Sequence, residues 1–146
     1  MEQAIKAAYK GIQKDDGGPF GAVVVKDGKV IAVGNHCVVK NNDPTAHGEI
    51  VAIRKACKKL KTFDLTGCEL YTTGEPCPMC YCACLWANIE KIYYGCTIAM
   101  NTDIGFRDKG FYTLINHRED KCVELDQEEC KKLFKDYKNM KGRTKY

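Results

Sequence analysis

Hydrophobic and polar residues follow two different periods along this chain, and the change of period separates helices from strands. Apolar residues at helical spacing predict four helices, over 2–14, 44–60, 77–88 and 126–138. Short runs of β-branched and aromatic residues predict five strands, over 20–25, 29–33, 68–73, 89–96 and 121–125. Asp27-Gly28 between the first two strands is typical of the type I′ turn of a hairpin. Asp43-Pro44 resembles an N-cap followed by proline at the first helical position.

The order of these elements is hairpin, helix, strand, helix, strand, which is typical of a mixed α/β fold. Strands joined through helices are expected to run parallel with right-handed crossovers. We therefore predict a three-layer α/β/α sandwich around a mixed five-stranded sheet. The segments 35–42 and 97–110 are expected to be loops, and 1–146 is expected to form a single domain.

Composition narrows the class of protein. The chain has 146 residues, of which 45% are hydrophobic and 29% charged, as in ordinary globular proteins. It contains no apolar stretch near 18 residues, so we expect no membrane span. The first twelve residues include three charged side chains and no hydrophobic signal region, which predicts a cytoplasmic protein.

Charge gives little indication of a nucleic-acid partner. Lys and Arg exceed Asp and Glu by 23 − 19 = 4. The excess is concentrated in 131–146, which has seven basic residues and one acidic residue. Such a segment is either a solvated helix face and tail or a contact for an anionic partner such as RNA. Because arginine and aromatic side chains are not interleaved there with the spacing of a base-reading surface, we favour the solvated face and do not expect nucleic-acid binding.

The ten cysteines are unevenly distributed. Without a secretory signal, most are expected to be reduced thiols or metal ligands. Six lie among apolar neighbours and are predicted to be small buried hydrophobic residues: Cys37, Cys57, Cys68, Cys96, Cys122 and Cys130. The other four fall within eight residues: Cys77, Cys80, Cys82 and Cys84.

Cys77 and Cys80 have the spacing of two ligands of one Zn²⁺ ion. They lie three residues apart in the first turn of a predicted helix, where the backbone N–H groups favour thiolate over thiol. His47 is the best of the three histidines for a third ligand, because it also lies near a helix start. One histidine and two thiolates leave a fourth position for water, which is typical of a catalytic zinc. We expect one Zn²⁺ per chain.

Glu49 is the candidate for moving protons at this site. A Zn²⁺ ion lowers the pKa of bound water to about 7, but hydrolysis also needs a group that carries a proton to the leaving group. Positions i and i+2 are about 200° apart on a regular helix, so spacing alone does not bring Glu49 to His47. Their convergence requires the metal to lie near the helix end.

Other interpretations of the cysteines are weaker. All four clustered cysteines could hold a structural zinc or an iron–sulfur site, but Cys82 would point to the opposite helix face from Cys80. A thioredoxin-like Cys-x-x-Cys motif lacks the βαβ context that such motifs have. On base rates, His36 and His117 would be surface or hydrogen-bonded structural histidines.

His-x-Glu followed by Pro-Cys-x-x-Cys is the known signature of zinc-dependent base deaminases. The chain resembles the cytidine-deaminase-like superfamily and, within it, most closely the bacterial guanine deaminases. The matching stretches are GGPFGAV (17–23), NDPTAHGE (42–49), AIRKAC (52–57), EPCPMC (75–80), GFRD (105–108) and the final Tyr146. The resemblance covers about 12–146, and its middle part is the most specific.

The resemblance implies a role for each matching residue. Zinc would be held by His47, Cys77 and Cys80, and Glu49 would shuttle protons. Asp108 would hydrogen-bond the purine edge and assist proton transfer, while Phe20 and Trp86 would flank the ring. Similar enzymes are homodimers that exchange their C-terminal segments, here about 126–146, so that Tyr146 closes the neighbouring active site. The implied reaction is hydrolysis of guanine to xanthine and ammonia.

Two positions depart from the family pattern. Gly48 replaces the usual alanine, and His36 stands where the family has a purine-contacting asparagine, with Asn35 next to it. Histidine offers one hydrogen bond per ring nitrogen, whereas an asparagine amide offers a donor and an acceptor. The alternatives are therefore a deaminase of another aminopurine, a purine nucleoside or an amino-triazine, a tRNA adenosine deaminase, or a non-catalytic zinc-stabilised binding module.

Overall fold

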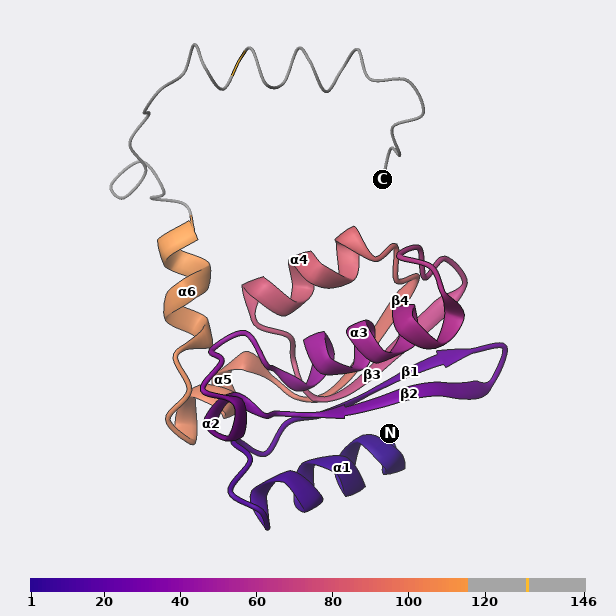
Figure 1. Ribbon diagram of the computed structural model, residues 1–146. Coiled ribbons are helices and arrows are strands. Elements are labelled where there is room, and N and C mark those ends of the chain that lie inside the picture. The colour runs from indigo at the N-terminus through magenta and orange to yellow at the C-terminus, as the bar shows by residue number, and fades with distance from the viewer. Residues whose placement is uncertain (116–130, 132–146) are drawn as a thin grey trace. The chain divides into compact units, whose positions relative to one another are not determined.

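A mixed β-sheet forms the centre of the computed structural model, which describes residues 1–115 and 131 (Figure 1). Its described strands are β1 (Gly21–Lys26), β2 (Lys29–Asn35), β3 (Cys68–Gly74) and β4 (Lys91–Cys96). They lie in the order β2-β1-β3-β4. β1 is antiparallel to both of its neighbours, and β3 is parallel to β4. The strand predicted at 121–125 and the helix predicted at 126–138 lie outside the described residues.

The hairpin between β1 and β2 confirms the predicted turn. Asp27 has a φ of 50° and Gly28 a φ of 70°. Positive φ at both central residues is the signature of a type I′ turn, whose twist matches that of the two strands. The register shifts between Val24 and Val25, so that β2 carries a bulge.

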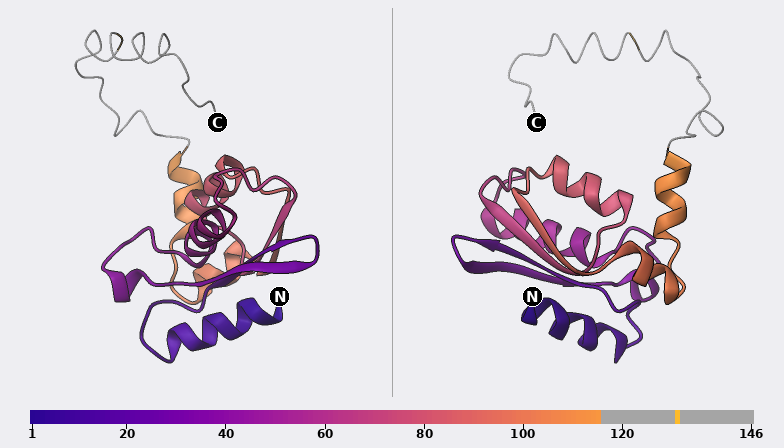
Figure 2. Two further views of the ribbon diagram at one scale, coloured as in Figure 1. Left: turned by 45° about the vertical axis from the view of Figure 1, so that its right-hand side comes forward. Right: turned by 180° about the vertical axis from the view of Figure 1, so that it is seen from behind.

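Helices cover both faces of the sheet, as predicted (Figure 2). α1 (Glu2–Ile12) lies on one face, and α3 (Gly48–Leu60) and α4 (Pro78–Trp86) lie on the other. Small apolar side chains fill the space between the sheet and the α3–α4 layer, among them Ala22, Val24 and Ala52. The mixed α/β sandwich is therefore confirmed, with four strands in the part of the chain that is described.

Met1–Tyr112 form one compact unit and Thr113–Tyr146 a second. The fold and the site described here belong to the first unit. The single domain over 1–146 stays a prediction. No helix in the described ranges combines the length and apolar character needed to cross a membrane.

Several predicted boundaries were wrong. α3 begins at Gly48 rather than at 44, because Asp43 does not cap a helix: its Oδ1 accepts from the backbone N–H and the hydroxyl of Thr45 and closes a turn. The predicted loops also contain helices: α2 (Val38–Asn41), α5 (Ile98–Asp103) and the start of α6 (Asp108–Ile115). The Oγ1 of Thr97 accepts from the Met100 N–H and caps α5, a signal the sequence carried.

The six scattered cysteines do not share one environment. Cys68 is buried in the core as predicted. Cys96 is exposed, which corrects the prediction, because β4 is an edge strand within the described residues and almost all of it is exposed. Cys37 and Cys57 are half-buried. Cys122 and Cys130 lie outside the described residues.

Candidate active site

The functional residues gather at one edge of the sheet. β2 and β3 are both antiparallel to β1, so they run parallel to each other and end at the same edge. Chain segments leaving that edge lead into α3 and α4, and the carboxyl ends of such strands are where α/β proteins bind ligands. His47 follows β2 and Cys77 follows β3, while Phe20 lies at the same edge immediately before β1.

His47, Cys77 and Cys80 form a cluster with the geometry of a zinc site, as the sequence predicted. Their ligand atoms all lie within 4.8 Å of one another. The Nδ1 of His47 is 3.6 Å from each of the two sulfur atoms. Ligands of a tetrahedral Zn²⁺, with bonds of about 2.3 Å to sulfur and 2.0–2.1 Å to nitrogen, lie about 3.6 Å apart. The residues present therefore fit one Zn²⁺ ion.

The two other clustered cysteines lie elsewhere. Cys84 is buried in the hydrophobic core and Cys82 is exposed on α4. Neither belongs to the metal-binding group that the described residues form. The four-thiolate interpretation is therefore not supported.

The start of α4 favours thiolate at the cluster. Cys77 is the N-cap residue, with Pro78 in the first helical position, and Cys80 lies in the first turn. A hydrogen bond from Cys80, a second from His47 and the charge of His47 lower the pKa of Cys77 to about 4. The site thus holds an anionic sulfur at neutral pH, the form that binds a metal ion.

Glu49 meets the cluster because His47 is not a helical residue. His47 is the N-cap of α3, with extended backbone angles (φ −69°, ψ 156°), and Glu49 is in the first turn. The 200° argument for a regular helix does not apply to this pair. The Thr72 hydroxyl lies 3.4 Å from Glu49 Oε1 and the Cys80 sulfur 3.5 Å from Oε2. Glu49 is only 5% exposed, and this burial raises the pKa of its carboxyl group.

Aromatic rings line the space beside the cluster. The Phe20 ring packs edge-to-face on Phe106, with 4.6 Å between centroids, and lies 5.7 Å from the His36 ring. The His36 ring lies in turn 4.8 Å from that of His47. Gly18 permits this packing, since a Cβ there would lie 2.5 Å from Phe106. Phe106 belongs to the quoted GFRD motif, although the sequence reasoning assigned it no role.

His36, rather than Asn35, lies on the side of the metal ligands. Consecutive strand residues point to opposite faces of a sheet. The Asn35 amide donates to Asp16 Oδ2 (3.0 Å), on the side of α1. The Gly18 N–H donates to His36 Nδ1 (3.0 Å), and burial lowers the pKa of His36 to about 4. His36 is therefore neutral, with its proton on Nε2.

Asp108 is held near the turn that carries Cys77. It is the first residue of α6 and is buried, and burial raises its pKa. The Asn101 amide donates to Asp108 Oδ2 (3.4 Å) and to the Glu75 carbonyl oxygen (3.2 Å). Asn101 is 1% exposed, and no motif in the sequence indicated it.

The structure does not bring Trp86 to the metal ligands. Trp86 is the last residue of α4, about 12 Å along the helix axis from Pro78, and is 68% exposed. Its role beside the substrate ring stays a prediction. Tyr146 lies outside the described residues, so its predicted role is also untested.

Comparisons with known proteins agree with this geometry. The family described as the zinc-binding region of cytidine and deoxycytidylate deaminases matches residues 1–96. Guanine deaminase of Bacillus subtilis (strain 168) is 46% identical over 116 residues, which are 80% of this chain and 74% of that protein. An X-ray structure of guanine deaminase from Bacillus subtilis matches with a TM-score of 0.91 at 40% identity, covering 99% of this chain and 95% of that chain.

A second group of relatives acts on transfer RNA. The tRNA-specific adenosine deaminase of Aquifex aeolicus (strain VF5) is 42% identical over 94 residues. The match covers 64% of this chain and 62% of that protein, so the chain spans about three fifths of its length. The match to the guanine deaminase structure extends over much more of both chains.

Proposed function

The chain belongs to the cytidine and deoxycytidylate deaminase family and is a zinc-dependent aminohydrolase, and on that premise we propose that it converts guanine to xanthine and ammonia. The observation that carries the proposal is the buried Glu49 carboxyl beside His47, Cys77 and Cys80. A binding module stabilised by zinc would not need an acidic side chain buried against the metal ligands, and burial of a carboxyl group costs free energy.

The chain's own residues supply the proton transfers. A Zn²⁺ ion held by His47, Cys77 and Cys80 would supply a water molecule of lowered pKa. As the oxygen of that water bonds to C2 of guanine, Glu49 would take a proton from it and pass this proton to the ring nitrogen. Glu49 would then take the remaining hydroxyl proton from the C2 oxygen and deliver it to the amine, so that the C2–N bond breaks and ammonia leaves while the C2 carbonyl of xanthine forms. The raised pKa of Glu49 suits a group that both accepts and donates protons.

His36 favours a substrate edge that accepts hydrogen bonds. Its Nδ1 already accepts from the Gly18 N–H, so its Nε2–H is left as a donor. Guanine presents O6 and N7 as acceptors on one edge, whereas adenine pairs an acceptor N7 with a donor amino group. Phe20 and Phe106 provide an apolar wall for the ring, and Asp108 accepts from the opposite edge.

The test measures ammonia release from guanine by purified, zinc-loaded protein, with xanthine identified by its absorbance. The parallel substrates are adenine, 2,6-diaminopurine, guanosine, an amino-triazine and a tRNA anticodon stem–loop. Guanine is expected to give the highest kcat/KM. A protein with one zinc per chain that ignores guanine but deaminates another of these substrates would contradict the choice of substrate and leave the aminohydrolase assignment intact.

We also propose that the protein is a homodimer that exchanges its C-terminal segment, about 126–146, so that Tyr146 closes the neighbouring site. Support comes from β4, whose exposed edge is open to a further strand in the described part of the chain. Large apolar side chains are also exposed on both faces, among them Tyr9, Leu85 and Tyr94.

Mixing two inactive variants tests the exchange. Glu49→Gln keeps the tail and loses the proton carrier, while Tyr146→Ala keeps the catalytic residues and loses the closing side chain. If tails cross between chains, unfolding and refolding the mixture forms some intact sites and restores part of the activity. Activity that stays at the level of the separately refolded variants would contradict exchange.

The cysteines support a reducing compartment, and we propose the cytoplasm. The eight cysteines in the described ranges are all free thiols. Disulfides form and persist in oxidising compartments and are rare in the cytosol.

A further inference from the structure

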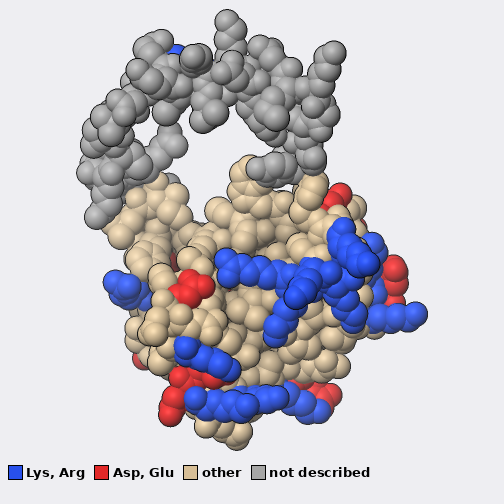
Figure 3. All heavy atoms as spheres, in the orientation of Figure 1, with Lys and Arg blue, Asp and Glu red and all other residues tan. Residues whose placement is uncertain are grey.

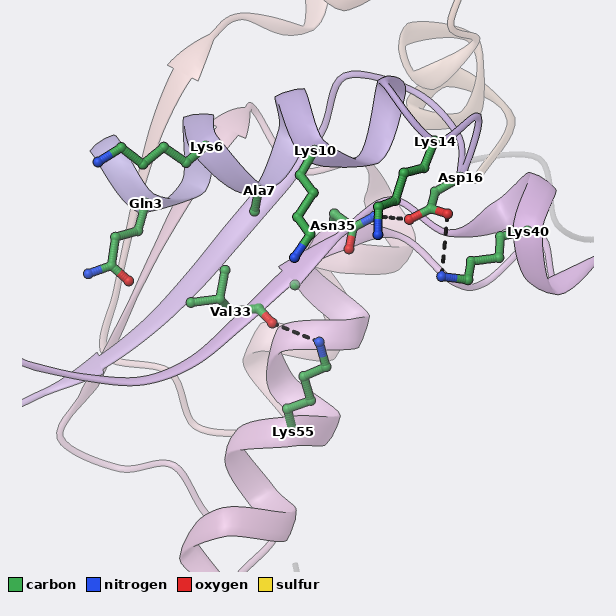
Figure 4. Close-up of a pocket in the computed structure, with 11 residues that line it drawn as sticks. Gln3, Lys6, Ala7, Lys10, Lys14, Asp16, Val33, Asn35, Lys40 and Lys55 are labelled. Atoms are coloured by element: carbon green, nitrogen blue, oxygen red, sulfur yellow. Dashed lines mark hydrogen bonds and ion pairs between the residues drawn. The ribbon is translucent and has the colours of Figure 1, made fainter.

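A hollow of about 680 Å³ lies along β2, between α1 on one side and Lys55 of α3 on the other (Figure 4). Eleven residues line it, and five of them are lysines: Lys6, Lys10, Lys14, Lys40 and Lys55. Asp16 is the one acidic residue in that lining. We call this feature the lysine groove. The sheet separates α1, which contributes Lys6 and Lys10 to the groove, from α4, which carries Cys80 (Figure 1).

The five lysines come from different parts of the chain and converge on β2. Lys6 and Lys10 lie on α1, and Lys14 follows the end of that helix. Figure 4 shows Lys10 and Lys14 reaching toward β2 from one side and Lys55, on α3, from the other. Basic side chains gather along α1 and across α3 in Figure 3. Like charges gathered in this way repel one another, and a bound anion would relieve that repulsion.

The acidic groups near the groove are already engaged. Asp16 is 6% exposed and accepts from the Asn35 amide, and its other oxygen lies 3.4 Å from the Lys40 ammonium. Lys6 pairs with Glu2 at the surface. The groove therefore keeps a positive balance.

Lys10 and Lys14 are the two lysines of the groove that have neither an ion pair nor a side-chain hydrogen bond within the described ranges, whereas Lys55 donates to the Val33 carbonyl oxygen. Neither makes an ion pair with any residue of the described ranges 1–115 and 131. Both belong to the lining. They are the groups that an incoming anion would meet.

The edge of β2 adds backbone donors. The Lys59 and Lys55 ammonium groups donate to the carbonyl oxygens of Ile31 and Val33 (3.0 and 2.9 Å). These bonds show that the carbonyl groups of Ile31 and Val33 point away from β1. In an antiparallel pair, the N–H and C=O of one residue point to the same side, so the Val33 N–H also lies on this outer edge. Val33 lines the groove.

We propose that the lysine groove binds an oligophosphate anion, that is, a chain of two or three phosphates, free or carried by a nucleotide. Ammonium and backbone N–H groups are the usual ligands of phosphate oxygens. The hollow has the size of small-molecule sites, about 300–1,000 Å³. Asp16 lies between Asn35 and Lys40 in the lining, and this acidic group among the lysines favours a short anion over a continuous nucleic-acid strand (Figure 4). The proposal does not depend on guanine as the substrate.

The experiment is calorimetric titration of the zinc-loaded full chain with inorganic tripolyphosphate and, separately, with ATP. The double variant Lys10→Gln/Lys14→Gln removes the two unpaired cations. Lys58→Gln/Lys91→Gln removes the same charge from exposed positions outside the lining. The groove variant should raise Kd about 10-fold or more and the control variant less than about 2-fold. Equal losses, no loss, or no binding to wild type would overturn the proposal.

Two further sets of titrations locate the binding site and identify the chemical group that it recognises. Tripolyphosphate and ATP with equal Kd values indicate that the phosphate chain is the recognised group, whereas tighter binding of ATP adds a nucleoside contact in the groove. Saturating guanine should leave both Kd values unchanged, and displacement would place the anion at the metal ligands and overturn the proposal. A 20-nucleotide RNA would also overturn the proposal if it binds more tightly than tripolyphosphate and if its binding is lost in the groove variant. That result would make this face a nucleic-acid surface.

Discussion

Asn35 and His36 are consecutive residues that belong to two different kinds of surface. The His36 ring lies among Phe20, Phe106 and His47, and burial keeps it neutral. The Asn35 amide turns the other way, toward the lysine groove. Around His36, polar groups are buried and engaged with one another. Around the lysine groove, cations from both faces of the sheet lie on exposed side chains.

This difference indicates how the two regions function. Burial strengthens electrostatic interactions and shifts pKa values, which a reaction with moving protons requires. Exposed lysines keep their charge and attract an anion without reacting with it. Substitutions on the catalytic side should therefore change the reaction by orders of magnitude, whereas single substitutions in the groove should leave it unchanged.

The largest effect is expected for Cys77→Ala. Loss of one of three ligands should remove zinc from the purified protein and reduce guanine turnover below about one thousandth of wild type. Metal analysis and ammonia release measure both quantities. Cys82→Ala is the matched control, because Cys82 is exposed and lies outside the ligand group. Full zinc occupancy in Cys77→Ala would show that Cys77 is not a ligand.

Glu49→Gln should abolish proton transfer without affecting zinc binding. The amide is nearly the same size as the carboxyl group but cannot carry a proton, so kcat should fall about 10²–10⁴-fold. Zinc content should stay at one per chain, since Glu49 is not a ligand. A Gln variant with wild-type kcat would refute the role of Glu49 as proton carrier.

Gly34→Ala should lower the free energy of unfolding of the fold that supports both regions. A Cβ at Gly34 would lie 2.3 Å from the Gly48 carbonyl oxygen and 2.6 Å from the Ala52 nitrogen. α3 would have to shift, at a cost of about 1–3 kcal/mol in the free energy of unfolding, measured with urea. Gly110→Ala is the control, because a Cβ there meets no atom within 4 Å. A wild-type unfolding midpoint for Gly34→Ala would show that α3 does not approach β2 so closely.

His36→Ala and Asn35→Ala should have different effects on KM for guanine, although the two residues are neighbours in the chain. His36→Ala removes the donor proposed for the substrate and the ring beside Phe20, so KM for guanine should rise about 10-fold, equivalent to about 1.4 kcal/mol. The kcat should change less than about 3-fold, because His36 is not assigned a proton transfer. Asn35→Ala should leave KM unchanged. A larger effect of Asn35→Ala than of His36→Ala would reverse the assignment of the two sides.

The smallest effect is expected for Lys6→Gln. Lys6 lies in the groove lining but pairs only with Glu2, and both side chains are largely exposed. Such pairs are screened by water and salt. The urea midpoint and kcat should match those of wild type within error, and a measurable loss of kcat would contradict the separation of the two regions.

Motifs with a local physical cause could be predicted from the sequence. Asp27-Gly28 predicts its turn because only a few residues adopt positive φ readily. Cys77 and Cys80 share one helical turn, so their proximity is local. The loops were harder: α5 begins at a Thr97 cap that could have been recognised, whereas the one-turn α2 has no comparable side-chain cap.

Contacts between distant segments could not be predicted from periodicity. His47 reaches Glu49 and Cys77 because it is an N-cap residue with extended backbone, which a regular helix would not permit. Asn101 joins the Glu75 carbonyl to Asp108 through contacts 26 and 7 residues apart in the chain, and no motif marks it.

The amino-acid sequence by itself determined the class of fold and the metal-binding group of His47, Cys77 and Cys80, and it predicted Glu49 as the proton carrier, because each depends on a recognisable motif or on spacing within a few residues. The tertiary structure decided what surrounds them. It placed His36 beside the metal ligands and Asn35 on the opposite side, and it left Trp86, the last residue of α4, largely exposed. It also gathered lysines from three helices and a loop around β2. Such arrangements depend on how the layers pack, and packing joins residues whose separation along the chain carries no periodic signal.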